Sequence, residues 1–160
     1  MRYLLIIATI TLFSCNTNKE IVKEASAPEP LTFTKLNSGT NGDFPEKIYK
    51  VITDQNTYNE IWGKAFAKFT NQQRPANIDF ETKMVVLVAS GMQRSGGFSI
   101  KVNSVEETKS AIIVNVENSK PGESCMTTSV ITFPYEIIEL KKSTKMVTFK
   151  TDDKVYDCEK

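Results

Sequence analysis

The sequence contains three cysteines and no histidine, and these two counts decide which chemistry its side chains could perform. Without histidine the chain lacks the usual general base near neutral pH, the Ser-His-Asp and Cys-His nucleophilic systems, and His-ligated zinc. A Ser–Lys pair stays open because both residue types are common here, but no local motif supports it. We therefore expect no enzymatic activity, no catalytic residue, no metal and no cofactor.

Cys15 follows a segment that is typical of a secretory leader. Arg2 precedes an uncharged apolar run of about eleven residues, well short of the ~20 that a membrane-spanning helix needs. The ending Leu12-Phe13-Ser14-Cys15 resembles the lipobox of bacterial lipoproteins. That resemblance implies cleavage after residue 14, a diacylglyceryl thioether on Cys15 and acylation of its new amine, for example by palmitate. The alternative is a buried core segment with an incidental cysteine.

The residues after Cys15 indicate a tether rather than a folded segment. Residues 16–30 lack hydrophobic periodicity and end in Ala27-Pro28-Glu29-Pro30. We expect a signal peptide over residues 1–14, a lipidated tether over 15–30 and one globular domain over 31–160. The protein would then lie in the cell envelope, anchored by lipid to a membrane on its periplasmic or cell-surface face. The outer membrane is favoured, although the residues after Cys15 leave the leaflet open.

Cys125 and Cys158 are the pair that remains once Cys15 is assigned to the lipid. In an oxidising compartment an even number of cysteines favours a disulfide. The bond would close a loop of about 33 residues and stabilise the fold by roughly 3–4 kcal/mol in the chain-entropy model. Two separate thiols are the alternative.

The charge of the chain argues against a polyanionic partner. The sequence has 20 Lys and Arg residues against 19 Asp and Glu, and removal of the leader with Arg2 brings the net charge to zero. Only Lys141-Lys142 are adjacent basic residues, so we expect neither nucleic acid nor an acidic lipid surface as a partner. The acidic pairs Glu106-Glu107 and Asp152-Asp153 are expected in solvated turns, since they lack the ligand spacing of a calcium loop.

A glycine-rich polar segment is the best candidate for partner binding. Its candidate residues are Gly91, Arg94, Ser95, Gly96, Gly97 and Phe98. Glycines between two strands can bring backbone N–H groups close to a partner or an anion, and Arg94 could add guanidinium donors for a carboxylate. The segment is not a phosphate-binding P-loop, because no Lys-Ser/Thr follows the second glycine. The alternative is a glycine turn or bulge that only lets strands cross closely.

One helix and seven or eight strands are predicted in the domain. The helix face follows the i, i+3, i+4 spacing of Tyr58, Ile61, Trp62, Ala65, Phe66 and Phe69. Thr53 or Asp54 could cap this helix, or Thr57 with Glu60 could cap a later start. Strands are expected over residues 31–36, 47–52, 84–89, 98–103, 111–116, 128–133, 135–140 and 145–150.

These elements predict an α+β domain that is mostly antiparallel β-sheet, sandwich- or barrel-like, with the amphipathic helix packed on it. Residues 84–89 are apolar throughout and predict a central buried strand. Strands 135–140 and 145–150 are expected to pair with each other. Trp62 is expected as a core anchor, and Pro134 and Tyr135 as a corner in which the tyrosine hydroxyl bonds to backbone.

The order of these features resembles the C-terminal domain of PrcB-type protease-complex subunits over residues 48–140. The features are Trp62, Pro75 with Asp79-Phe80, the apolar strand from Met84 to Ala89, Gly91, Gly96-Gly97-Phe98, Pro121-Gly122 and Phe133-Pro134-Tyr135. Many members of that family are lipoproteins or secreted proteins. The resemblance therefore implies a non-catalytic module that binds another protein.

Three functions follow from these features as hypotheses. The leading one is a membrane-anchored accessory module that binds an extracytoplasmic protein, for example a protease, through residues Gly91 to Phe98. The second is an inhibitor that inserts Arg94-Ser95-Gly96-Gly97 into an envelope protease. The third is a structural envelope lipoprotein that has no dedicated ligand.

Overall fold

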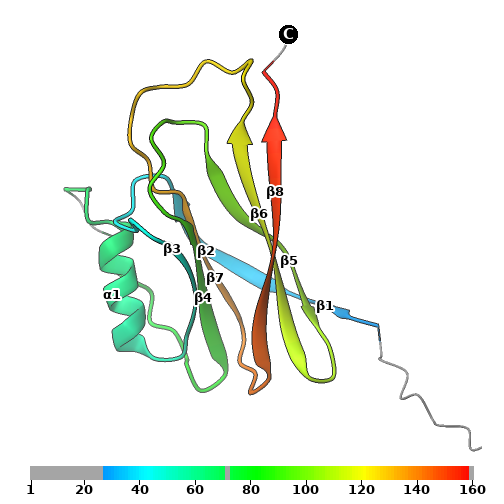
Figure 1. The fold of residues 1–160 in the computed structure, drawn as a ribbon. Helices are drawn as coiled ribbons and strands as arrows, with labels where there is room; N and C mark the ends of the chain where they lie inside the picture. The colour runs from blue at the N-terminus through cyan, green and yellow to red at the C-terminus, as the bar shows by residue number, and fades with distance from the viewer. Residues whose placement is uncertain (1–26, 71–72, 159–160) are drawn as a thin grey trace, which may run out of the picture.

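The computed structural model describes residues 27–70 and 73–158, which form three layers (Figure 1). Helix α1 covers one face of a first sheet with strand order β2-β7-β4-β3, and a second sheet with order β1-β5-β6-β8 covers the other face. The elements are β1 (Glu29–Leu31), β2 (Phe33–Gly39), β3 (Lys47–Ile52), α1 (Gln55–Ala65), β4 (Lys83–Ser90), β5 (Ser99–Glu107), β6 (Ala111–Pro121), β7 (Tyr135–Lys141) and β8 (Met146–Tyr156).

The predicted fold class is confirmed. The described residues form eight strands and one short helix, and the two sheets pack as a sandwich without closing into a barrel. All strand pairs are antiparallel except β6 and β8, which run parallel. Among the described residues, both hydrophobic cores lie between Leu31 and Phe149.

Strand β4 is the centre of the sandwich, as its uninterrupted apolar sequence predicts. Val85, Leu87 and Ala89 belong to the core beneath α1, whereas Met84, Val86 and Val88 belong to the core between the sheets. Alternate residues of a strand point to opposite faces, so a strand covered on both sides needs an apolar residue at every position.

Helix α1 begins at Gln55 because Asp54 caps it. The Asp54 carboxylate accepts a hydrogen bond of 2.9 Å from the Thr57 amide. This confirms one of the two predicted early caps and excludes the later start at Thr57. The helix ends at Ala65, so Phe69 lies beyond it and is exposed, and the predicted apolar face is one turn too long.

The three predicted anchors all lie in the core or at its edge. Trp62 is buried, contacts the rings of Tyr58 and Phe66, and donates from Nε1 to the Gln73 carbonyl at 2.7 Å. Pro134 is buried and its carbonyl accepts from the Ser90 amide. The Tyr135 ring packs at a tilt against Phe44, and its hydroxyl lies 2.6 Å from Asn37 Oδ1 and 3.4 Å from the backbone oxygen of Ala65. The hydroxyl therefore bonds mainly to a side chain, with a longer contact to backbone.

Two predictions about the C-terminal strands are wrong. Strands β7 and β8 do not pair, because both edges of β7 are already occupied by β2 and β4. The chain instead crosses to the second sheet, where β8 pairs with β6. Residues 128–133 form only isolated bridges rather than a strand, and Val130 and Ile131 are exposed.

Smaller differences occur at the ends of strands. The expected strand 31–36 is two strands, since β1 ends at Leu31 in the second sheet and β2 begins at Phe33 in the first. The folded part thus includes Glu29 and Pro30. Asp152-Asp153 lie within β8 and Glu106-Glu107 at the end of β5, so neither acidic pair forms a turn. The hairpin turn itself is residues 108–110.

We expect Trp62→Ala to lower the free energy of unfolding by about 3–5 kcal/mol, because it removes a buried indole and leaves a cavity between α1 and the first sheet. Urea unfolding followed by circular dichroism measures this change. Trp62→Phe is the control, since it keeps most of the buried area and loses only the hydrogen bond to Gln73. A loss below about 1 kcal/mol in Trp62→Ala would contradict the anchoring role.

Candidate functional site

The segment from Gly91 to Phe98 connects β4 to β5 at one end of the sandwich (Figure 1). Gly91 and Gly97 have φ angles of 78° and 89°, which side-chain-bearing residues rarely adopt. A Cβ at Gly91 would lie 3.0 Å from the Lys47 amide nitrogen, and one at Gly97 would lie 2.9 Å from the Tyr156 hydroxyl. Both glycines are therefore required by the way the chain crosses its neighbours.

Three of the eight backbone amides of this loop donate hydrogen bonds within the domain. Amides of Met92, Gln93 and Gly96 donate to the carbonyls of Pro45, Thr132 and Thr128 at 2.8–3.0 Å. These three N–H groups are thus not available to an external ligand. Arg94 differs, because its side chain is exposed and has no hydrogen bond or ion pair to another described residue.

A second loop, residues 122–134, lies against the first. Gln93 and Thr132 form an isolated antiparallel bridge, and the Ser95 carbonyl accepts from the Thr132 hydroxyl at 3.0 Å. The predicted disulfide between Cys125 and Cys158 is present, with Cα atoms 4.9 Å apart, and it ties this loop to the residues after β8. The Tyr156 hydroxyl donates to the Gly97 carbonyl at 2.8 Å. The two loops and the end of β8 therefore form one connected unit.

Exposed apolar side chains gather on these loops. Met92, Met126, Val130 and Ile131 are each more than half exposed. Arg94 and Ile131 are the chain neighbours of the bridged residues Gln93 and Thr132, so the two loops meet at this point. We call the five residues Met92, Arg94, Met126, Val130 and Ile131 the loop-end surface. Methionine, arginine and exposed apolar clusters are typical of protein-binding surfaces.

A cleft of about 220 Å³ opens beside this surface, between the ends of the two sheets. Its walls include Ser90, Phe98, Asn118, Lys120 and Asp153. Asn118 donates to Asp153 at 2.8 Å, and the Ser90 hydroxyl lies 3.4 Å from the Asn118 amide oxygen. This chain of hydrogen bonds joins the sheets and contains no pairing of a nucleophile with a base. Phe98, which precedes β5, thus contributes to the wall of the cleft.

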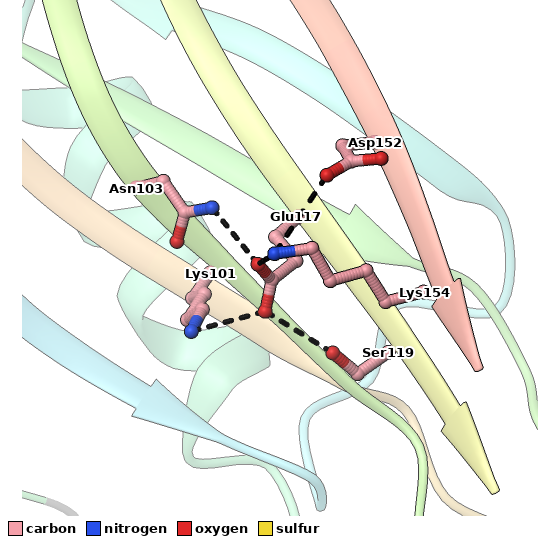
Figure 2. Close-up of polar contacts among 6 residues, drawn as sticks. All are labelled: Lys101, Asn103, Glu117, Ser119, Asp152 and Lys154. Carbon is pink, nitrogen blue, oxygen red and sulfur yellow. Dashed lines mark hydrogen bonds and ion pairs between the residues drawn. The ribbon is translucent and has the colours of Figure 1, made fainter. Parts of the chain in front are cut away.

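A second polar group lies on the outer face of the second sheet (Figure 2). Glu117 on β6 is only 6% exposed, yet it has two lysines as partners, Lys101 on β5 at 3.0 Å and Lys154 on β8 in still closer contact. Asn103 donates to the same carboxylate at 3.0 Å, and Ser119 lies at 3.3 Å. On each of the strands β5, β6 and β8 the residues of this group are two positions apart. Residues with this spacing point to the same face of a sheet.

Glu117 and Glu136 show opposite electrostatic behaviour. Hydrogen bonds from Lys154, Asn103 and Lys101 lower the pKa of Glu117 to about 2. Glu136 on β7 is buried, and this burial raises its pKa above the ordinary value of 4.5, although Lys35 lies 3.8 Å away. Glu117 is therefore held as a carboxylate by its partners, whereas Glu136 is a charge that the fold disfavours.

The Glu117 group is absent from the sequence predictions. In the sequence, the group corresponds to three pairs of polar residues, each two positions apart: Lys101 and Asn103, Glu117 and Ser119, and Asp152 and Lys154. That spacing has meaning only when β5, β6 and β8 are known to be neighbours. The parallel pairing of β6 with β8 is not local, so the spacing alone could not assemble the group.

Some predictions concern residues or groups that the structure describes only in part. Cys15 and the leader lie outside the described residues. Within residues 27–70 and 73–158 no cluster of three His, Cys, Asp or Glu side chains could hold a metal ion. No helix in the same ranges is long and apolar enough to cross a membrane.

Fold and site together define a β-sandwich domain with one covering helix and two linked loops at one end of the sandwich. A family model described as PrcB C-terminal matches residues 84–141 of this chain. This confirms the resemblance over β4 to β7, including both loops, while Trp62 and Pro75 precede the matched stretch. The match points to an accessory domain that is associated with a protease complex. Comparisons with curated proteins and with solved structures give no match.

We expect the two buried glutamates to give opposite pH effects. The stability from Glu117 is complete above its ordinary pKa of 4.5 and is lost as pH falls toward about 2, because its folded pKa is lowered. Glu117→Gln should therefore have a lower melting temperature than the wild type at pH 7, and the two melting temperatures should converge near pH 2. Glu136 has a raised folded pKa, so its ionisation costs stability as pH rises above 4.5. The melting temperature of Glu136→Gln should thus increase relative to that of the wild type as pH rises.

Thermal unfolding of the wild type and both variants between pH 2 and pH 7 measures these differences. Each variant serves as the control for the other, because both replace a buried glutamate by its amide. The same pH dependence in both variants would show that the partners of Glu117 do not set its pKa.

Proposed function

We propose that this chain is a lipid-anchored accessory module outside the cytoplasm that binds a protease or another subunit of a protease complex. The observation that carries the proposal is the PrcB C-terminal match over residues 84–141, which includes both loops of the loop-end surface. The module would be non-catalytic. The absence of histidine and the internal pairing of the polar groups in the cleft and around Glu117 support this part of the proposal.

The loop-end surface suits a protein partner. Its apolar residues are held in place by the Gln93–Thr132 bridge and by the Cys125–Cys158 disulfide, so little ordering of the loops would be required on binding. Arg94 adds an exposed guanidinium that no described residue pairs, and arginine is a frequent contributor of binding energy at interfaces. The partner would therefore present an apolar patch with a carboxylate beside it.

The inhibitor hypothesis has less support. An inserted loop needs backbone that is free to pair with the protease, but the Gly96 amide and the Ser95 carbonyl are bonded to Thr128 and Thr132 of the same domain. The enzymatic activity of the recovered protease distinguishes the two roles. An accessory module leaves the activity intact or raises it, whereas an inhibitor abolishes it.

Membrane attachment through Cys15 is a separate part of the proposal, and the lipobox-like ending Leu12-Phe13-Ser14-Cys15 supports it. We expect Cys15→Ser to prevent labelling by palmitate and to release the protein from the membrane fraction, because Cys15 would carry the acyl chains. Labelling followed by fractionation measures both effects. Cys125→Ser is the control and should keep the label. Unchanged membrane attachment of Cys15→Ser would contradict the anchor.

We expect Met126→Asp and Arg94→Ala to reduce recovery of the protease partner from an envelope extract at least tenfold. The first change places a charge in the apolar contact, and the second removes the guanidinium. Affinity capture on the immobilised domain, with quantitative mass spectrometry, measures the recovery. Ser110→Asp is the control, since it introduces the same charge at an exposed residue of the turn between β5 and β6, at the opposite end of the sandwich. Equal recovery by all variants would remove the loop-end surface from the proposal.

A further inference from the structure

Strand β8 is an edge that no described element covers. It has eleven residues, lies at the end of the strand order β1-β5-β6-β8, and has β6 as its only strand partner among the described residues (Figure 1). Every residue from Lys150 to Tyr156 is exposed. An edge strand presents unpaired N–H and C=O groups along its outer side, and these can bind another strand.

The other three edges carry features that prevent such pairing. Strand β1 has only three residues and contains Pro30. Strand β2 has a register shift between Lys35 and Asn37, and β3 has only six residues. By contrast, the register of β8 with β6 runs unbroken from Met146 to Tyr156, and β8 contains no proline. Strand β8 is therefore the long, regular edge of this domain.

We propose that β8 pairs with β8 of a second copy of this chain, antiparallel and centred on Thr151. The twofold axis would be perpendicular to the sheet, so the two second sheets would form one continuous sheet. Residues equally distant from Thr151 in sequence would then lie opposite each other. Such self-complementary pairing is the general property of a twofold interface.

The side chains of β8 match in this register. Met146, Val155 and Tyr156 are 71%, 58% and 40% exposed, although they are large and apolar. Pairing around Thr151 places Met146 opposite Tyr156, and Val147 opposite Val155. All three exposed apolar side chains of β8 thereby gain an apolar partner on the second copy, which reduces the apolar area in contact with water.

The charges at the centre of β8 select the same register. With Thr151 on the axis, Lys150 lies opposite Asp152 of the second copy, and this pair occurs twice. With Lys150 or Asp152 on the axis, a lysine or an aspartate would lie opposite itself, and like charges directly opposed are destabilising. Lys150 has no ion pair within the described residues, so it is available for this contact.

Phe149 and Asp153 would also be opposed in this register, but each has a partner in its own protomer. Phe149 stacks on Tyr49 at 5.3 Å between ring centroids, and Asp153 accepts from Asn118 at 2.8 Å. They point toward the space between the sheets, where Val147 and Phe149 pack on the core. This pair therefore does not need to make contact across the axis.

Sedimentation equilibrium of the oxidised chain without residues 1–15 tests the proposal, since that chain keeps every described residue of both cores. We expect a concentration-dependent dimer. Lys150→Glu should weaken it at least tenfold by placing like charges opposite, and Asp152→Lys should do the same. The double variant Lys150→Glu/Asp152→Lys should restore the dimer, which a merely structural defect would not allow. Lys50→Glu on β3 is the matched control and should remain dimeric.

A cross-link gives a second measurement that does not depend on affinity. Thr151→Cys should form a covalent dimer under oxidation, because residue 151 faces its own copy. Met146→Cys should not, because its two copies would lie ten residue positions apart along the paired strands, about 33 Å. A wild type that stays monomeric at all concentrations, a dimer unchanged by Lys150→Glu, or equal cross-linking of both cysteine variants would overturn the proposal.

Discussion

Burial of β4 and β7 on both faces is the constraint on which the rest of the molecule depends. Each of these strands has a neighbour on both edges and a covering layer on both faces, so apolar residues must occupy most of their positions. Neither α1 nor the second sheet could cover both faces alone. The three layers follow directly from this requirement, because an exposed face of β4 would place Val86 and Val88, or Val85 and Leu87, in water.

The same constraint decides where polar groups can lie. Glu136 is the charged residue of β7 that is almost wholly buried, and it requires a donor from Val102 on the second sheet together with the nearby Lys35. Other polar groups occupy the outer face of the second sheet, around Glu117, or the end where the sheets separate. Groups that could bind a partner therefore lie at the loops and edges of the sandwich and not at its centre.

Local patterns in the sequence predict most of the elements, but they do not predict which distant segments pair. The period of 3.6 from Tyr58 to Phe66 and the apolar run of β4 depend on neighbouring residues only, and both predictions are confirmed. Alternation in residues 128–133 predicts a strand, but the partner edges are taken and the segment forms a loop. The crossing of β8 to the other sheet, and with it the Glu117 group, depends on the occupied edges of β7. Those edges are a property of the assembled sheet.

Tyr156 connects the two surfaces that this fold exposes. It ends β8, where its backbone oxygen accepts from the Gly122 amide, and its hydroxyl donates to the carbonyl of Gly97 in the loop between β4 and β5. The disulfide at Cys158 lies two residues further on and closes the 122–134 loop against the same strand. Any contact that fixes the end of β8 therefore also restrains both loops of the loop-end surface. Because these links already hold the loops against β8, pairing of β8 and binding at the loops would act on one connected unit of the domain.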